Sequence, residues 1–165
     1  MRSIFTLLSL LFVACAFGET IQKVEYQLPP SAKNWVVSFN QEADIGTTRI
    51  YTSPGVERRD AKEFFGVNGN PFPSDFKDTS EFKKGLSLGN LGMDIDFHVL
   101  EEFKDGILYE WSGKKNGVAK IHGLGRAFSN KEGTVILSYQ SENVSEIPQA
   151  RSAWLPALKA AKQKN

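Results

Sequence analysis

The chain has 165 residues, and its composition (41% apolar, 24% charged, 12% aromatic) is typical of a globular protein of one domain. It holds 20 basic and 19 acidic residues, and without residues 1–18, which contain Arg2 and no acid, the balance is formally neutral. A neutral chain gives no reason to expect nucleic acid or an anionic membrane as a partner. After residue 18, no stretch is long and apolar enough to predict a transmembrane helix.

Residues 1–18 have the features of a secretory signal peptide. Arg2 precedes an uncharged apolar run, Ile4–Ala14, and small residues at Ala16 and Gly18 suit a signal peptidase. We predict cleavage after Ala16 or Gly18, a single domain over residues 19–165, and export to the periplasm or the medium.

Cys15 is the only cysteine, and it lies inside this leader. Either it is removed with the signal peptide, or it is the lipidated residue of a bacterial lipoprotein, although Phe12 stands where a lipobox usually has leucine. In both cases the mature domain has no disulfide and no thiol nucleophile.

Three strands are predicted at the start of the mature chain. They cover Gln22–Leu28, which Pro29-Pro30 ends, then Trp35–Phe39 and Thr47–Thr52, which are rich in β-branched and aromatic residues. We expect them to form an N-terminal sheet or a sheet edge.

A short helix is predicted over Val56–Phe65, followed by a long loop over Gly66–Lys77. Two prolines, two glycines and two asparagines favour the loop, and a connection of this length is often functional. Phe72 and Phe76 either hold the loop on the core or contact a partner. A second helix is predicted over Asp78–Asn90, with Asp78 and a glutamate three residues later as a capping box.

The stretch Met93–Tyr139 predicts an antiparallel meander of four strands. We expect three-residue turns, because Lys104–Gly106 then pairs Phe103 with Ile107, and Lys115–Gly117 places Trp111 opposite Ile121. The resulting apolar face carries Ile95, Phe97, Tyr109, Trp111 and Ile121. We expect Trp154 of a C-terminal helix to pack on this face.

The opposite face of the meander gathers both histidines of the chain. The expected register places Asp96, His98, Glu110 and His122 on one patch. Imidazole and carboxylate groups are ligands of zinc and iron, and they are also used in acid–base catalysis. The other interpretation is a solvated sheet face, which needs no function.

The last segment predicts a helix that begins near Ser145 and Pro148. Pro156 either bends this helix or lies in the first turn of a new helix that begins at Ser152. Motifs of serine hydrolases, phosphate-binding loops and zinc proteases are absent. The pair Gly123 and Gly125 indicates a bulge or close packing under Trp111.

The order of these elements resembles a known family. A strand with Trp35, a strand that ends in Tyr51-Thr52-Ser53-Pro54-Gly55, a helix, a meander and a helix with Trp154 are similar to the exported Mog1/PsbP-like α/β sandwiches, including the DcrB type. The long loop Gly66–Lys77 departs from that pattern. The resemblance implies a non-catalytic binding or assembly role without a cofactor, and it transfers no catalytic residue.

The sequence therefore predicts an α+β protein in which an antiparallel sheet packs with short helices and a C-terminal helix. The expected function is that of an exported binding or assembly protein of the bacterial envelope or secreted fraction, with Phe72 and Phe76 as contact residues for a protein or small molecule. The alternative is an envelope hydrolase or metal-binding protein that uses Asp96, His98, Glu110 and His122.

Overall fold

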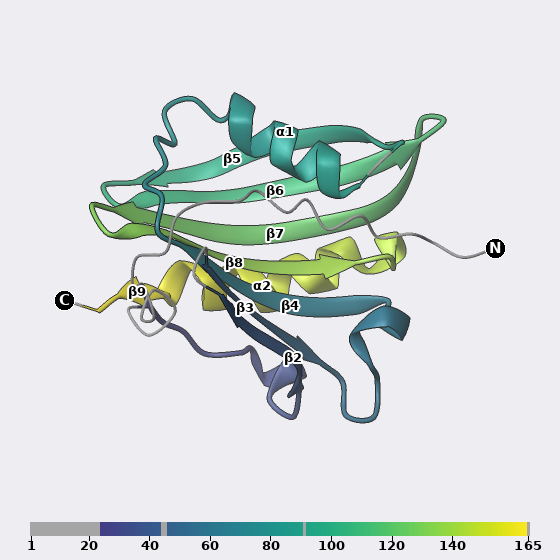
Figure 1. The fold of residues 1–165 in the computed structure, drawn as a ribbon. Coiled ribbons are helices and arrows are strands. Elements are labelled where there is room, and N and C mark those ends of the chain that lie inside the picture. The colour runs from purple at the N-terminus through teal and green to yellow at the C-terminus, as the bar shows by residue number, and fades with distance from the viewer. Residues whose placement is uncertain (1–23, 44–45, 91, 165) are drawn as a thin grey trace.

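A seven-stranded antiparallel sheet forms the centre of the protein (Figure 1). The structure is a computed structural model and describes residues 24–43, 46–90 and 92–164. In spatial order the strands are β2 (Val36–Ala43), β3 (Gly46–Thr52), β4 (Glu63–Asn70), β8 (Gly133–Ser141), β7 (Val118–Asn130), β6 (Gly106–Lys115) and β5 (Asp94–Phe103). The predicted α+β class and the four-stranded meander are confirmed.

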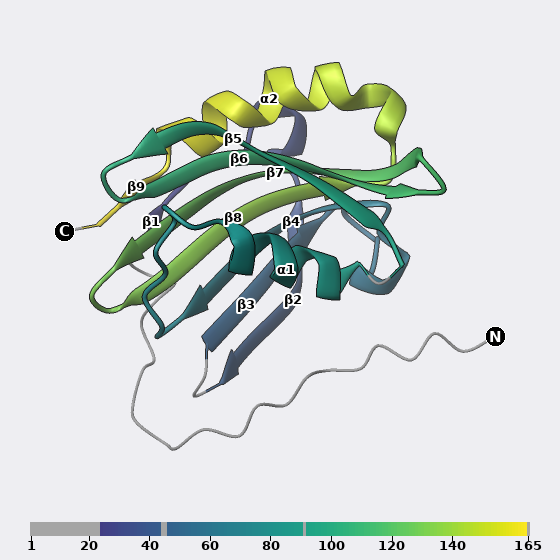
Figure 2. The same ribbon diagram turned by 90° about the horizontal axis from the view of Figure 1, so that it is seen from above.

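Two helices cover opposite faces of the sheet, α1 (Ser80–Gly89) on one side and α2 (Ile147–Ala160) on the other (Figure 2). Short 3-10 helices lie at η2 (Pro30–Ala32), η3 (Arg58–Asp60) and η4 (Val144–Glu146). Neither α1 nor any other helix of the described residues has the length and apolar character needed to span a membrane.

The first predicted strand ends earlier than expected and has a different partner. Gln22 and Lys23 lie outside the described residues, and of the others only Val24–Glu25 form a strand, β1, which pairs with β9 (Lys162–Gln163) instead of joining the hairpin of β2 and β3. Both ends of the described chain therefore meet in a two-stranded sheet beside α2.

The core between the sheet and α2 is built from aromatic rings. Trp154 of α2 stacks on Tyr139 (ring centroids 4.5 Å apart) and on Phe65 (5.2 Å). Leu124 and Leu137 are fully buried beside them. The prediction that Trp154 packs on the face of Trp111 and Ile121 is therefore wrong, because the face expected to be solvated carries enough apolar area for a helix of its own.

The core on the other face lies under α1. Phe82 of α1 contacts Tyr109 and Phe97, with ring centroids 5.0 and 5.7 Å away. Trp111 and Ile121 belong to the same buried cluster. The two cores explain why the sheet has hardly any wet face in its central strands.

The meander keeps the predicted faces over most of its length but not the predicted register. Phe103 pairs with Gly106 across a two-residue turn, and a bulge between Val99 and Glu101 then shifts the pairing, so that Phe97 faces Trp111. Trp111 in turn pairs with Gly123 and not with Ile121, after a second bulge next to the hairpin. Beyond the bulges each pairing differs from the expected one by two residues, so Phe97 and Trp111 stay on their predicted side. Beside the first hairpin the difference is one residue, so the expectation that Phe103 shares a face with Ile107 is wrong: Phe103 packs with the core under α2 and Ile107 with the core under α1.

The largest error in the prediction concerns residues 56–70. The expected helix Val56–Phe65 and the first part of the expected loop Gly66–Lys77 are replaced by η3 and by β4, a central strand paired on both sides. Phe65 and Val67 face α2 and are buried. Their burial stabilises a strand that the glycine-rich sequence alone does not predict. The loop that remains covers residues 71–79.

The two long helices differ from expectation only at their ends. Helix α1 is shorter than Asp78–Asn90, its N-cap is Thr79, and no capping box forms; Asp78 instead accepts a hydrogen bond from the amide of Ser80 (2.9 Å). Helix α2 is one continuous helix with Pro156 inside it, so a separate helix starting at Ser152 does not form.

Two glycines of β7 allow large rings to lie flat on the sheet. A Cβ at Gly123 would stand 2.1 Å from the ring of Trp111, and a Cβ at Gly125 would stand 2.2 Å from the ring of Tyr109. The predicted close packing under Trp111 is confirmed. The same arrangement recurs two residues further along β7, where Gly125 lies under Tyr109.

Candidate functional site

The four polar residues of the predicted patch share one face of the sheet but do not converge. Asp96, Ser112 and His122 form one cross-strand row, while His98 stands opposite Glu110 in the next row. The expected rows, with His98 beside Ser112 and Glu110 beside His122, are wrong because of the bulges described above. Within the described part of the chain, no three His, Cys, Asp or Glu side chains are grouped so that they could hold a metal ion.

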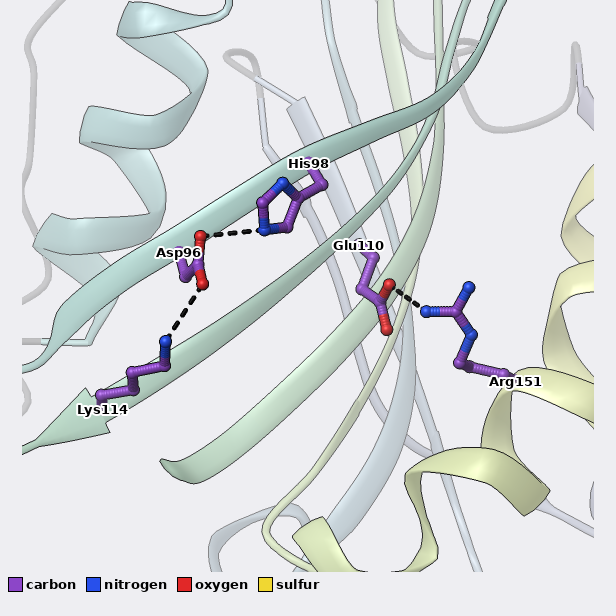
Figure 3. A network of polar contacts seen from close by, with 5 residues as sticks. All are labelled: Asp96, His98, Glu110, Lys114 and Arg151. Carbon is purple, nitrogen blue, oxygen red and sulfur yellow. Dashed lines mark hydrogen bonds and ion pairs between the residues drawn. The ribbon is translucent and has the colours of Figure 1, made fainter. Parts of the chain in front are cut away.

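Asp96 and His98 form a surface pair on edge strand β5. His98 Nε2 lies 2.9 Å from one carboxylate oxygen of Asp96, and Lys114 Nζ lies 3.1 Å from the other (Figure 3). The hydrogen bond and charge of Lys114 lower the pKa of Asp96, and His98 adds a smaller effect. The carboxylate is therefore ionised and already engaged, in a solvated position where such pairs are common without function.

Glu110 points toward helix α2 and not toward the histidines. Its carboxylate forms an ion pair with Arg151 of α2 (Figure 3). Only 18% of the Glu110 side chain is exposed, against 42% of the Arg151 side chain. This contact holds the helix over the sheet, which is a structural use of the acid.

His122 is buried beneath α2, and 1% of its surface is exposed. Its ring lies edge-on to Tyr139 at a centroid distance of 5.9 Å, and neither ring nitrogen has a hydrogen-bond partner among the residues that the structure describes. Burial lowers the pKa of His122, and the nearby charge of Glu110 offsets this in part. The imidazole is therefore neutral in the fold and closed to substrate.

The loop 71–79 separates the two phenylalanines that the sequence singles out. Phe76 is partly buried against the cluster under α1, and its ring meets Phe82 edge-on at 6.0 Å. Phe72 is 57% exposed. Phe76 therefore holds the loop on the core, and Phe72 is presented to solvent.

The backbone around Phe72 is held by hydrogen bonds to the sheet and within the loop. Thr134 Oγ1 donates to the carbonyl of Phe72 (2.7 Å), and the amide of Phe72 donates to Asn70 Oδ1 (2.9 Å). Two residues later, the amide of Ser74 donates to Ser129 Oγ (2.8 Å). The exposed ring therefore projects from a fixed segment at one end of the sheet.

An open groove of about 480 Å³ lies between the N-terminal segment and α2. Residues 25–30 form one wall, and Ala153, Pro156, Ala157 and Ala160 form much of the other. The sequence could not reveal this groove, because it arises from the pairing of β1 with β9. It holds no cluster of catalytic or metal-binding side chains.

The fold and the positions of these residues describe an α+β protein with a PsbP-like fold, as the sequence predicts. The solution structure of cyanobacterial PsbP (CyanoP) from Synechocystis sp. PCC 6803 aligns with a TM-score of 0.53 and 11% identity, over 92% of this chain and 98% of that chain. No family model matches the sequence, and no curated protein matches it. The likeness is one of fold.

Proposed function

We propose that this protein is a non-catalytic binding or assembly protein and that Phe72 is its principal contact residue. The observation that carries the proposal is the exposure of Phe72 on a loop whose backbone is fixed. An exposed phenylalanine costs solubility, and large aromatic side chains are enriched where proteins contact partners.

The geometry of the loop favours binding in a second way. Pro71 and Pro73 flank Phe72 and restrict the backbone, and the hydrogen bonds from Thr134 and to Asn70 hold it further. A partner that covers the ring would lose little conformational entropy in ordering the loop, so more of the contact energy remains as affinity.

The proposal is narrower than the sequence prediction, which names Phe72 and Phe76 together. Phe76 contacts Phe82, so its removal would disturb the core under α1 and would not report on binding alone. Phe72 is therefore the proposed contact residue, and Phe76 is a residue of the same loop with a structural role.

We also propose that the protein works outside the cytoplasm. The signal-peptide features of residues 1–18, and Cys15 among them, lie outside the described residues and support this from the sequence alone. Intact mass of the protein from its native host distinguishes cleavage after Ala16 or Gly18 from lipidation at Cys15. An unprocessed chain starting at Met1 would contradict export through a cleaved leader.

The binding proposal is tested by replacing Phe72 with serine in the full chain. Proteins captured from a native extract are quantified for the wild type, for Phe72→Ser and for Val118→Ser, which removes an equally exposed apolar side chain (57%) from the β6–β7 hairpin at the other end of the sheet (Figure 1). A specific partner, once purified, should bind the wild type and the Val118 variant equally and bind Phe72→Ser at least tenfold more weakly. Equal binding by all three proteins would refute the role of Phe72.

A further inference from the structure

The two edges of the sheet differ in how they are protected against strand addition. Edge strand β5 carries four acidic residues, Asp94, Asp96, Glu101 and Glu102, and a bulge. Edge strand β2 carries one charge, Glu42, and exposes Val36 and Val37, each 47% accessible. Charges and bulges are the usual means of keeping an edge from pairing. Strand β2 also has a pairing shift, between Val37 and Phe39, but with a single charge it is the less protected edge.

The part of β2 that could accept another strand is its second half. The pairing of β2 with β3 shifts between Val37 and Phe39 and is regular from Phe39 to Ala43. On the outer side of this stretch, the described residues provide no further strand, so the backbone groups that point away from β3 have no ladder partner. Such an edge can be extended by an antiparallel strand.

Two charged residues of opposite sign lie beside this stretch. Glu42 of β2 and Arg49 of β3 project from the same face of the sheet, and within the described residues neither forms an ion pair. The Nε of Arg49 donates to Asn40 Oδ1 on the edge strand (3.4 Å), and the same guanidinium also forms a hydrogen bond with the side chain of Tyr51.

We propose that a second copy of this chain pairs with β2 as an antiparallel strand, with Gln41 opposite Gln41 of the second copy at a twofold axis. This register sets Asn40 opposite Glu42 of the second copy and Phe39 opposite Ala43. A twofold arrangement is self-complementary, so each contact occurs twice.

Charge supports this register over other pairings. The guanidinium of Arg49, which already extends over Asn40, would face Glu42 of the second copy, and the reciprocal contact would form on the other side. A parallel pairing would place the two Glu42 side chains beside each other, which is unfavourable. Pairing of β2 with the acidic β5 edge would leave Glu42 among acids and would build an open-ended chain.

The expected dimer is reversible. One strand pair is smaller than the interface of a stable dimer, so the complex should dissociate on dilution. The row of Gln41, Thr48 and Asn68 on the other face, in which Thr48 donates to Asn68 (3.1 Å), would continue across the twofold axis as a polar ladder.

Sedimentation velocity of the purified full-length mature protein over a concentration series tests the proposal. The wild type should show a monomer–dimer equilibrium. Gln41→Lys should abolish the dimer, because two lysines would then stand opposite each other. Gln149→Lys, which makes the same change at an exposed position of α2, should leave the equilibrium unchanged. A wild type that stays monomeric at millimolar concentration, or a dimer that survives Gln41→Lys, would overturn the proposal.

A charge exchange tests the register. Glu42→Arg and Arg49→Glu should each weaken the dimer about tenfold, since each dimer then holds two repulsive contacts, and the double variant should recover the wild-type equilibrium. Circular dichroism of each variant checks that the fold is kept. A double variant as weak as the single variants would refute the contact between Arg49 and Glu42.

Discussion

Glu110 on β6 and Arg151 on α2 form the ion pair that connects the polar side of the meander to the C-terminal helix. The acid is mostly covered and the arginine is half exposed, so the pair lies at the margin of the interface between helix and sheet. The contact explains why the carboxylate of Glu110, which the sequence suggests for catalysis, turns toward α2 although His98 is its cross-strand partner.

We predict that this pair contributes about 1 kcal/mol to the free energy of unfolding, since charged hydrogen bonds exceed neutral ones but solvent weakens a partly exposed pair. A double-mutant cycle with Glu110→Gln and Arg151→Met, followed by urea unfolding, measures the coupling energy. Strictly additive effects of the two substitutions would show that the ion pair is not stabilising.

His122 should make the protein less stable in acid. Burial lowers the pKa of His122 in the folded state, so below about pH 6.5 the unfolded chain takes up a proton that the folded chain refuses. The free energy of unfolding should therefore fall as the pH decreases from 6.5 toward the folded pKa, by at most about 1.4 kcal/mol per pH unit from this group.

Replacement of His122 by leucine separates this effect from the titration of carboxylates. The variant should be about 1 kcal/mol more stable at pH 7, because two unpaired buried nitrogens are removed, and it should lose part of the acid sensitivity. His98→Leu at an exposed position should change neither property to the same extent. The same slope of stability against pH in the wild type and the His122 variant would contradict this account.

Two glycine-to-alanine substitutions should have opposite effects. Gly125→Ala should destabilise the protein by about 2–3 kcal/mol, because a Cβ would overlap the ring of buried Tyr109. Gly85→Ala in α1 has open space around its Cβ and should stabilise by about 0.5–1 kcal/mol through helix propensity. Thermal unfolding of both variants checks the pair, and similar shifts in Tm would refute the packing described for β7.

The meander shows what sequence patterns can determine. Alternation of residues such as Phe97, Tyr109 and Trp111 predicts correctly which side chains share a face, because that pattern has a period of two. The register could not be predicted, because the bulge between Val99 and Glu101 has no sequence signal and shifts the pairing by one residue.

The strand β4 and the site show what local patterns miss. Gly66 and Gly69 indicate a loop, yet β4 is held between β3 and β8 by pairing partners distant in sequence. Similarly, the polar residues of the strand with His122 predict a solvated face. In the structure His122 contacts Tyr139 of the neighbouring strand, and Trp154 of α2 stacks on Tyr139. Phe72 and Phe76 are alike in the sequence, and only tertiary contacts distinguish the exposed ring of Phe72 from the partly buried ring of Phe76.

The most direct test of the binding proposal places a photocrosslinking amino acid at position 72 of the full chain in its native host, and at position 118 as a comparison. We predict one specific crosslinked product from position 72 that is absent from position 118 and is reduced when unlabelled wild-type protein competes. Identical products from both positions, or none from position 72, would contradict the claim that Phe72 contacts a partner.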